Sequence, residues 1–204
     1  MHIAITGNIG AGKTTLACLL AEHYGWDVLY EAVEGNPYLA DFYDDMERWS
    51  FNLQIYFLNS RFDQVKTIRS SGRSVIQDRT IYEDAYIFAK NLYESGSMTE
   101  RDYQTYRSLF ENMLSLVRPP DLMIYLRADL PKLTGQIRKR GRSFEQSISD
   151  AYLASLNRLY DEFARTYGAG ELLIIDVNEL DYANRPADFQ AIIEQIDARL
   201  SILS

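Results

Sequence analysis

A glycine-rich segment near the start of the chain carries the residue types best suited to phosphate chemistry. Residues 7–14, GNIGAGKT, have the spacing G-x-x-x-x-G-K-[ST]. In this spacing the glycines let backbone N–H groups turn toward phosphate oxygens, the lysine reaches the β and γ phosphates, and the next hydroxyl can bind Mg²⁺. The segment therefore predicts ATP as a ligand and Mg²⁺ as its cofactor. The candidate nucleotide-binding residues are Gly7, Asn8, Ile9, Gly10, Ala11, Gly12, Lys13, Thr14 and Thr15.

Two further apolar runs end in carboxylates that can take part in phosphate chemistry. Glu31 is expected at the end of the second run, where it can take the proton of an attacking hydroxyl, although a structural ion pair would leave the same pattern. Asp78 ends the third run and can bind Mg²⁺ together with Thr14. Arg79 follows and can neutralise the charge of a transferring phosphoryl group or orient Glu31.

A basic segment in the second half of the chain contrasts with an acidic background. Residues 136–146 contain Arg138, Arg140 and Arg142, with a lysine and a glycine that can serve as a hinge. A basic run is usually a solvated helix face. In a chain with a phosphate-binding loop it favours a lid that closes over the phosphates, so we expect the three arginines to bind ATP.

An alternation of strands and helices must position these residues. The apolar runs lack the strict alternation of a half-exposed sheet and predict buried parallel strands, while segments with apolar residues three and four apart predict helices. This order predicts an α/β fold with a five-stranded parallel sheet flanked by helices, and a ligand at the carboxyl ends of the strands. The predicted strands are residues 2–6, 26–33, 74–78, 122–126 and 172–177. One predicted helix begins at residue 13, and the others cover residues 48–70, 80–95, 99–117, 146–167 and 186–202.

Composition narrows the class of protein. The chain has 204 residues with no repeat or linker, which predicts a single domain over residues 1–204. Its 21 basic and 29 acidic side chains give a net charge of −8, which argues against nucleic acid as a partner. No apolar run is long enough for a membrane span and no signal peptide is evident, so we expect a cytoplasmic protein. The single cysteine, Cys18, excludes an intramolecular disulfide and is expected in the core.

The motifs together resemble the deoxynucleoside kinase family, the group that phosphorylates deoxycytidine, deoxyadenosine and deoxyguanosine. GNIGAGKTT, the YEAVEGNPY segment around Glu31, and DRTIYEDAYIFA from Asp78 follow the family's order over nearly the whole chain. The resemblance implies the P-loop kinase fold, Glu31 as the base toward the 5′-hydroxyl, Mg²⁺ binding by Asp78, and a phosphate or base-orienting role for Arg79. The lid is similar, except that Gln136 replaces an arginine found in some members.

The same resemblance implies a nucleoside site. Gln54 matches the amide that pairs with the base edge and Arg61 a base-pocket arginine, while Tyr43 and Glu145 match the pair that holds the 3′-hydroxyl and favours deoxyribose. Asp84 corresponds to an acidic residue that accompanies bases with an exocyclic amine, which disfavours thymidine, while Ala85 replaces an arginine often found next and leaves purine and cytosine both open. The motifs SGSM, RGRSFEQSI and LLIIDVNELDY are most similar to bacterial members that prefer deoxyadenosine or deoxyguanosine, so we expect a purine deoxynucleoside. Several aromatic residues can line the base pocket: Trp49, Phe51, Tyr56 and, as a site residue, Phe88.

Other functions share parts of this pattern. A switch GTPase is disfavoured because the chain lacks D-x-x-G after a strand and N-K-x-D. A nucleoside monophosphate kinase shares the phosphate loop and a basic lid, but its charged acceptor would prefer an arginine where Glu31 stands. A non-catalytic nucleotide-binding scaffold would need a broken catalytic position, and none is evident. The family further implies a homodimer through a helix bundle that includes residues 48–70 and 99–117, although a face buried within one molecule would have the same sequence pattern.

Overall fold

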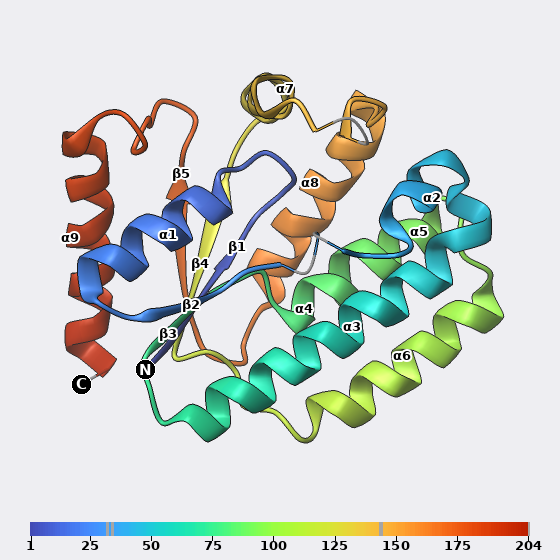
Figure 1. Ribbon diagram of the computed structural model, residues 1–204, viewed down its shortest axis with the longest axis horizontal. Coiled ribbons are helices and arrows are strands. Elements are labelled where there is room, and N and C mark those ends of the chain that lie inside the picture. Colours follow the sequence, from blue (N-terminus) through green and yellow to red (C-terminus); the bar gives the residue numbers. More distant parts are fainter. Residues whose placement is uncertain (32, 34, 143–144, 204) are drawn as a thin grey trace.

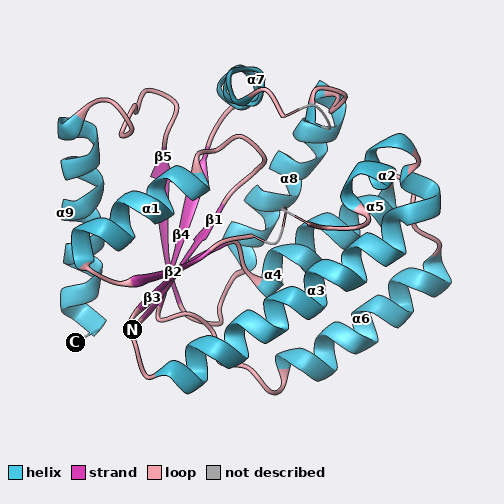
Figure 2. Ribbon diagram, viewed as in Figure 1, coloured by secondary structure: helices cyan, strands magenta, loops and turns pink. Residues whose placement is uncertain are grey.

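Five parallel strands form the centre of the protein, which is described here by a computed structural model over residues 1–31, 33, 35–142 and 145–203. The strand order is β2-β3-β1-β4-β5, so β1 lies between β3 and β4 (Figure 2). The predicted α/β fold with a parallel sheet is confirmed. The strands are β1 (His2–Thr6), β2 (Asp27–Leu29), β3 (Val75–Asp78), β4 (Leu122–Arg127) and β5 (Glu171–Asp176).

Helices cover both faces of the sheet. In Figure 1, α1 and α9 lie on one side, and the larger group that includes α3, α6 and α8 lies on the other. The helices on the first side are α1 (Lys13–Tyr24) and α9 (Pro186–Leu203), and α7 (Leu130–Arg140) lies above the sheet; the others are α2 (Leu39–Asp44), α3 (Met46–Ser71), α4 (Ile81–Glu83), the π-helix η1 (Asp84–Ala89), α5 (Lys90–Glu94), α6 (Glu100–Leu114) and α8 (Asp150–Thr166).

Strand β4 shows why the sheet needs both layers. Leu122, Ile124 and Leu126 belong to the core that faces α1 and α9, whereas Met123 and Tyr125 belong to the core on the opposite face. All five side chains are buried. A parallel sheet covered on both faces has apolar residues at successive positions, as the apolar runs predicted.

The ends of α3 follow from local chemistry. The Asp45 side chain accepts a hydrogen bond from Arg48 N at 3.0 Å and so satisfies one of the free N–H groups of the first turn. At the other end Gly72 has φ 64°, a left-handed conformation that glycine adopts at low cost. Between these residues α3 runs from the end beside α2 to the end near the N-terminus of the chain (Figure 1).

Three sequence expectations need correction. Strand β2 covers Asp27–Leu29 rather than residues 26–33, because this edge strand pairs only with β3, so Glu31 lies two residues beyond the strand. The helix expected at 80–95 is interrupted by the π-helix η1. Cys18 is exposed instead of buried, because α1 turns Leu16 and Leu20 toward the core.

The lid segment begins as a helix. Residues 136–140 form the C-terminal part of α7, and Gly141 caps the helix with φ 70°. Residues 143–144 of the predicted lid lie outside the described part of the chain. Among the described residues, none of the helices combines the length and apolar character needed to cross a membrane.

Candidate active site

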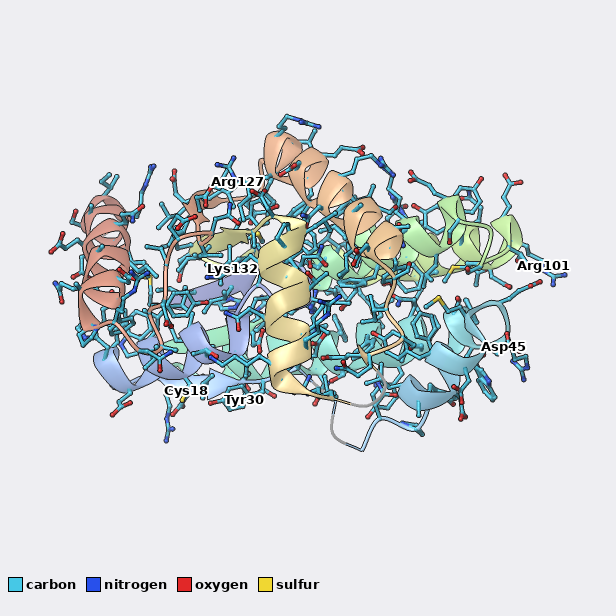
Figure 3. All side chains as sticks on the ribbon, turned by 90° about the horizontal axis from the view of Figure 1, so that it is seen from above. Cys18, Tyr30, Asp45, Arg101, Arg127 and Lys132 are labelled. Carbon is cyan, nitrogen blue, oxygen red and sulfur yellow. The ribbon has the colours of Figure 1, made fainter. Side chains whose placement is uncertain are left out.

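Two adjoining cavities open at the carboxyl ends of the strands. The first has a volume of about 420 Å³ and the second about 470 Å³. Both are lined by Gly10, Lys13 and Thr14 of the phosphate loop and by Arg140 and Arg142. Seen from above, α7 lies across the middle of the molecule (Figure 3). The phosphate loop and the basic segment therefore form the boundary shared by the two cavities.

The phosphate loop depends on glycine backbone geometry. Gly10 has φ 85°, and a Cβ atom there would lie 2.7 Å from the carbonyl oxygen of Leu133 in α7. Lys13 is buried, and its Nζ donates to the Asn8 carbonyl oxygen at 3.0 Å. Burial, followed by the charge of Arg79, lowers the Lys13 pKa to about 8. An anion in this loop would favour the charged form of the lysine.

Thr14 and Asp78 fit a magnesium site. Thr14 Oγ1 donates to Asp78 Oδ2 at 2.5 Å, and the buried Asp78 Oδ1 has no hydrogen-bond partner. The described residues contain no group of three or more His, Cys, Asp or Glu side chains able to hold a metal. Mg²⁺ commonly takes one or two protein oxygens and completes its octahedron with water and substrate phosphates, so a hydroxyl and one carboxylate suit it.

Glu31 lies between two buried arginines. Its Oε1 accepts from Arg61 Nη2 at 2.8 Å and lies 2.7 Å from Arg79 Nε. Burial alone would raise the Glu31 pKa, but Arg79, Arg61 and then Lys13 outweigh it and lower the pKa to about 2. The carboxylate is thus ionised throughout the neutral range and keeps 22% of its side chain exposed toward the cavity.

The inner end of the first cavity carries unsatisfied polar groups. Gln54 is buried and its Oε1 has no hydrogen-bond partner. Asp84 Oδ2, which likewise lacks a hydrogen-bond partner, lies 3.5 Å from Arg61 Nε. Burial raises the Asp84 pKa to about 7, although Arg61 opposes the shift. Buried polar atoms without partners are costly, so this end of the cavity is suited to a planar ligand with both donors and acceptors.

The π-helix η1 brings Asp84 and Phe88 to this cavity. Both residues line it, one turn apart. The Phe88 ring lies under the Arg79 guanidinium, with 4.6 Å between the ring centroid and Arg79 Cζ. A π turn inserts one residue into a helix and is often found at functional sites.

Glu145 connects Arg140 and Arg142 of the predicted lid to the first cavity. Its Oε2 accepts from Arg140 Nε at 2.9 Å and from Nη2 at 2.5 Å, and its Oε1 accepts from Arg142 Nη1 at 3.3 Å. Tyr43 lines the same wall, and burial followed by the neighbouring Tyr152 and Glu145 raises its pKa. The predicted sugar-binding pair is therefore brought together at this wall, next to two of the three lid arginines.

Comparison with known proteins identifies the family. Residues 3–201 match the model of the family described as deoxynucleoside kinase. The chain belongs to the deoxynucleoside kinase family. The predicted P-loop kinase fold and ATP-dependent deoxynucleoside kinase class are thereby confirmed.

Individual relatives agree with this membership. The kinase is 41% identical to a deoxyadenosine/deoxycytidine kinase of Bacillus subtilis, over 95% of this chain and 90% of the relative. It is 48% identical to a deoxyadenosine kinase of Dictyostelium discoideum, over 79% of this chain and 66% of the relative. The solved deoxyadenosine kinase of M. mycoides, with products dCMP and dCDP bound, superposes with a TM-score of 0.87 at 33% identity, over 97% of this chain and all of that one.

Most residues singled out in the sequence of the kinase meet at the two cavities. Gly12 and Thr15 line the second one, whereas Gly7, Asn8 and Ala11 line neither. The Asn8 side chain, for example, donates to Leu153 O of α8 at 3.0 Å. The residues at the first cavity are Ile9, Gly10, Lys13, Thr14, Glu31, Tyr43, Gln54, Asp78, Arg79, Asp84, Phe88, Arg140, Arg142 and Glu145.

Two arginines of the kinase are placed differently from the expectation. Arg61 is fully buried and does not line the first cavity; it contacts two residues that do, Glu31 and Asp84. Arg138 is exposed and lines neither cavity. The second cavity is instead lined by Lys139 and by Gln136, which lies three residues before Lys139 on α7. Helical periodicity explains this, because residues three apart share a helix face and Arg138 lies off that face.

Sequence reasoning missed other parts of the kinase site. Trp49, Phe51 and Tyr56 do not line the first cavity; Leu53, Phe57 and Phe42 do. The second cavity is closed by the loop after β5, where the Tyr182 hydroxyl donates to the Gly12 carbonyl oxygen at 3.1 Å. This loop follows the end of a parallel strand, and that position was the available signal.

Proposed function

We propose that this kinase transfers the γ-phosphoryl group of ATP, with Mg²⁺, to the 5′-hydroxyl of a purine deoxynucleoside in nucleotide salvage. The observation that carries the proposal is the position of Glu31. An ionised carboxylate lies at the wall that joins the nucleoside-sized cavity to the phosphate loop, held by two arginines. Such a group suits an acceptor that enters as a neutral hydroxyl and must lose a proton.

The residues divide the work of phosphoryl transfer among them. Glu31 orients the 5′-hydroxyl and takes its proton late, because a base with a pKa of about 2 gains the proton only when the attacking oxygen has become acidic. Lys13, Arg79 and the lid arginines Arg140 and Arg142 neutralise charge on the phosphate oxygens. Thr14 and Asp78 hold Mg²⁺, which when bound neutralises charge on the β and γ phosphates.

Base preference follows from the inner end of the cavity. Gln54 offers an amide that donates and accepts, and an ionised Asp84 accepts from an exocyclic amine. Adenine presents such an amine beside a ring nitrogen, and thymine does not. Two of the relatives above are named as deoxyadenosine kinases. We therefore place deoxyadenosine first among the purines, with Tyr43 and Glu145 binding the 3′-hydroxyl.

The experiment is a panel of acceptors. The purified protein is incubated with Mg-ATP and, separately, deoxyadenosine, deoxyguanosine, deoxycytidine, thymidine, adenosine and dTMP, and the phosphorylated products are quantified. We expect a purine deoxynucleoside to give the highest kcat/KM and dTMP to be inert. Turnover of dTMP alone would instead identify a monophosphate kinase, and no turnover with any acceptor despite ATP binding would identify a non-catalytic scaffold.

We also propose that the kinase is a cytoplasmic homodimer. Leu116, two residues beyond the end of α6, is exposed by 63%; helix α6 itself buries Tyr106 and Phe110 but leaves Leu109 exposed, by 36%. It lies at the outer edge of the molecule beside α3 (Figure 1). Exposed leucines on such a helix favour packing against a second copy, and sedimentation equilibrium would measure the mass in solution.

A further inference from the structure

Several contacts besides the one to Glu31 hold the backbone and the side chain of Arg79 in place. It is the one residue other than glycine with a positive φ in the described chain, at 74°. This conformation is unfavourable for a side chain with a Cβ atom, and it persists only where the surroundings enforce it. The backbone contributes through Arg79 N, which donates to Ile5 O in β1 at 2.9 Å.

Glu83 fixes both the side chain and the following turn. Its Oε1 accepts from Arg79 Nη1 at 3.1 Å, and its Oε2 accepts from Thr80 N at 2.8 Å. Glu83 is fully buried and lies one turn after Arg79. The Glu83 carboxylate therefore caps the N-terminus of α4 and also binds the Arg79 guanidinium.

Tyr160 completes the contact from another part of the chain. Its hydroxyl accepts from Arg79 Nη1 at 2.7 Å and donates to Glu83 Oε1 at 2.8 Å. Tyr160 is fully buried in α8. The three side chains form a closed triangle of hydrogen bonds, in which Arg79 Nη1 is fixed while Nε faces Glu31. Helix α8 follows the lid in the sequence, so the triangle joins the lid side of the protein to the catalytic arginine (Figure 1).

We propose that Glu83 and Tyr160 are positioning residues for phosphoryl transfer, which hold the Arg79 guanidinium toward Glu31 and the phosphate loop. This inference rests on the proposed function, because it assumes that Arg79 acts in the transfer. Neither residue lines either of the two cavities described above. They act through Arg79, and a small misplacement of a charged group in an active site is enough to slow the reaction.

The test is Tyr160→Phe, which removes the hydroxyl and keeps the ring. Tyr125→Phe is the matched control, because the Tyr125 ring stacks on Tyr160 at 5.7 Å but its hydroxyl contacts Asp161 instead of Arg79. We expect Tyr160→Phe to lower kcat about tenfold, the effect of one hydrogen bond to a charged group. The KM values for ATP and nucleoside should stay within twofold, and Tyr125→Phe should stay within twofold in kcat.

A double-mutant cycle separates positioning from a general structural effect. If Tyr160 acts through Arg79, the Tyr160→Phe change adds little to the loss already caused by Arg79→Lys. If the losses in kcat of the two single variants instead multiply in the double variant, the proposal is overturned. An unchanged kcat in Tyr160→Phe would also overturn it. An inactive wild type with every acceptor would overturn the proposed function and this inference together, whereas an active wild type with an unimpaired Tyr160→Phe overturns this inference alone.

Discussion

Replacing Glu31 with glutamine tests the base and the charge balance of the site at once. The amide has nearly the same volume, but it carries no charge and cannot take a proton. General base catalysis contributes about 10²–10⁴-fold to rate, and a base with a pKa near 2 lies at the low end of that range. We therefore expect Glu31→Gln to lower kcat about 100-fold, with a dissociation constant for deoxyadenosine close to that of the wild type.

The same substitution should also destabilise the folded protein. The Glu31 pKa falls from 4.5 to about 2 on folding, which corresponds to about 3 kcal/mol of stabilisation of the charged form. Because the folded pKa is the lower one, this stabilisation is complete above about pH 4.5 and is lost as the pH falls through 2. In a chain of this length, 3 kcal/mol lowers the melting temperature by roughly 6–12 °C.

The assay measures ADP release at 25 °C, thermal unfolding at neutral and acidic pH, and deoxyadenosine binding by calorimetry. Glu94→Gln is the matched control, because Glu94 also contacts two cations, Lys90 and Arg158, but at the surface. Surface ion pairs contribute about 0–1 kcal/mol, so this variant should keep its rate and nearly all of its stability. A Glu31→Gln enzyme with more than a tenth of the wild-type kcat would refute the base, and an unchanged melting temperature would refute the charge argument.

Two other predictions concern the walls of the cavities. Because burial raises the Asp84 pKa to about 7, the carboxylate is ionised above that pH, so KM for deoxyadenosine should rise as the pH falls from 8 to 6. Asp84→Asn should remove that trend, and a flat KM in the wild type would contradict the argument. Lys139 lines the second cavity beside the phosphate loop, whereas Arg138 lines neither cavity. Lys139→Ala should therefore raise KM for ATP about fivefold, the effect of about 1 kcal/mol, while Arg138→Ala should leave this KM unchanged. Equal effects of the two substitutions in steady-state kinetics would contradict the placement of α7.

The parts of the site that the sequence predicts are those set by local geometry. A phosphate loop between a strand and a helix positions its own backbone, so GNIGAGKT is sufficient to place Lys13 and Thr14. Asp78 and Arg79 are placed equally well, because the end of a buried parallel strand lies at the ligand edge of the sheet. Each of these two motifs lies within about ten consecutive residues, so its position in the fold can be predicted without knowing contacts between distant segments.

The remaining parts depend on contacts between distant segments. Tyr160 and Glu83 are 77 positions apart, and nothing local in either segment indicates that they share Arg79. Arg138 and Lys139 are neighbours with the same charge, and only the rotation of α7 about its axis distinguishes them. The π turn in η1 is similarly invisible, since the apolar spacing of residues 80–95 fits a regular helix almost as well.

The exposure of Cys18 has a practical consequence for measuring this enzyme. The chain contains one cysteine, so a thiol-reactive fluorophore would attach at a single known position without prior mutagenesis. Figure 3 shows Cys18 beside Tyr30, and Tyr30 lines the first cavity. A dye at this position would lie next to a residue of the first cavity, with every other side chain unchanged. Its emission could then follow substrate entry and product release in real time, one turnover at a time.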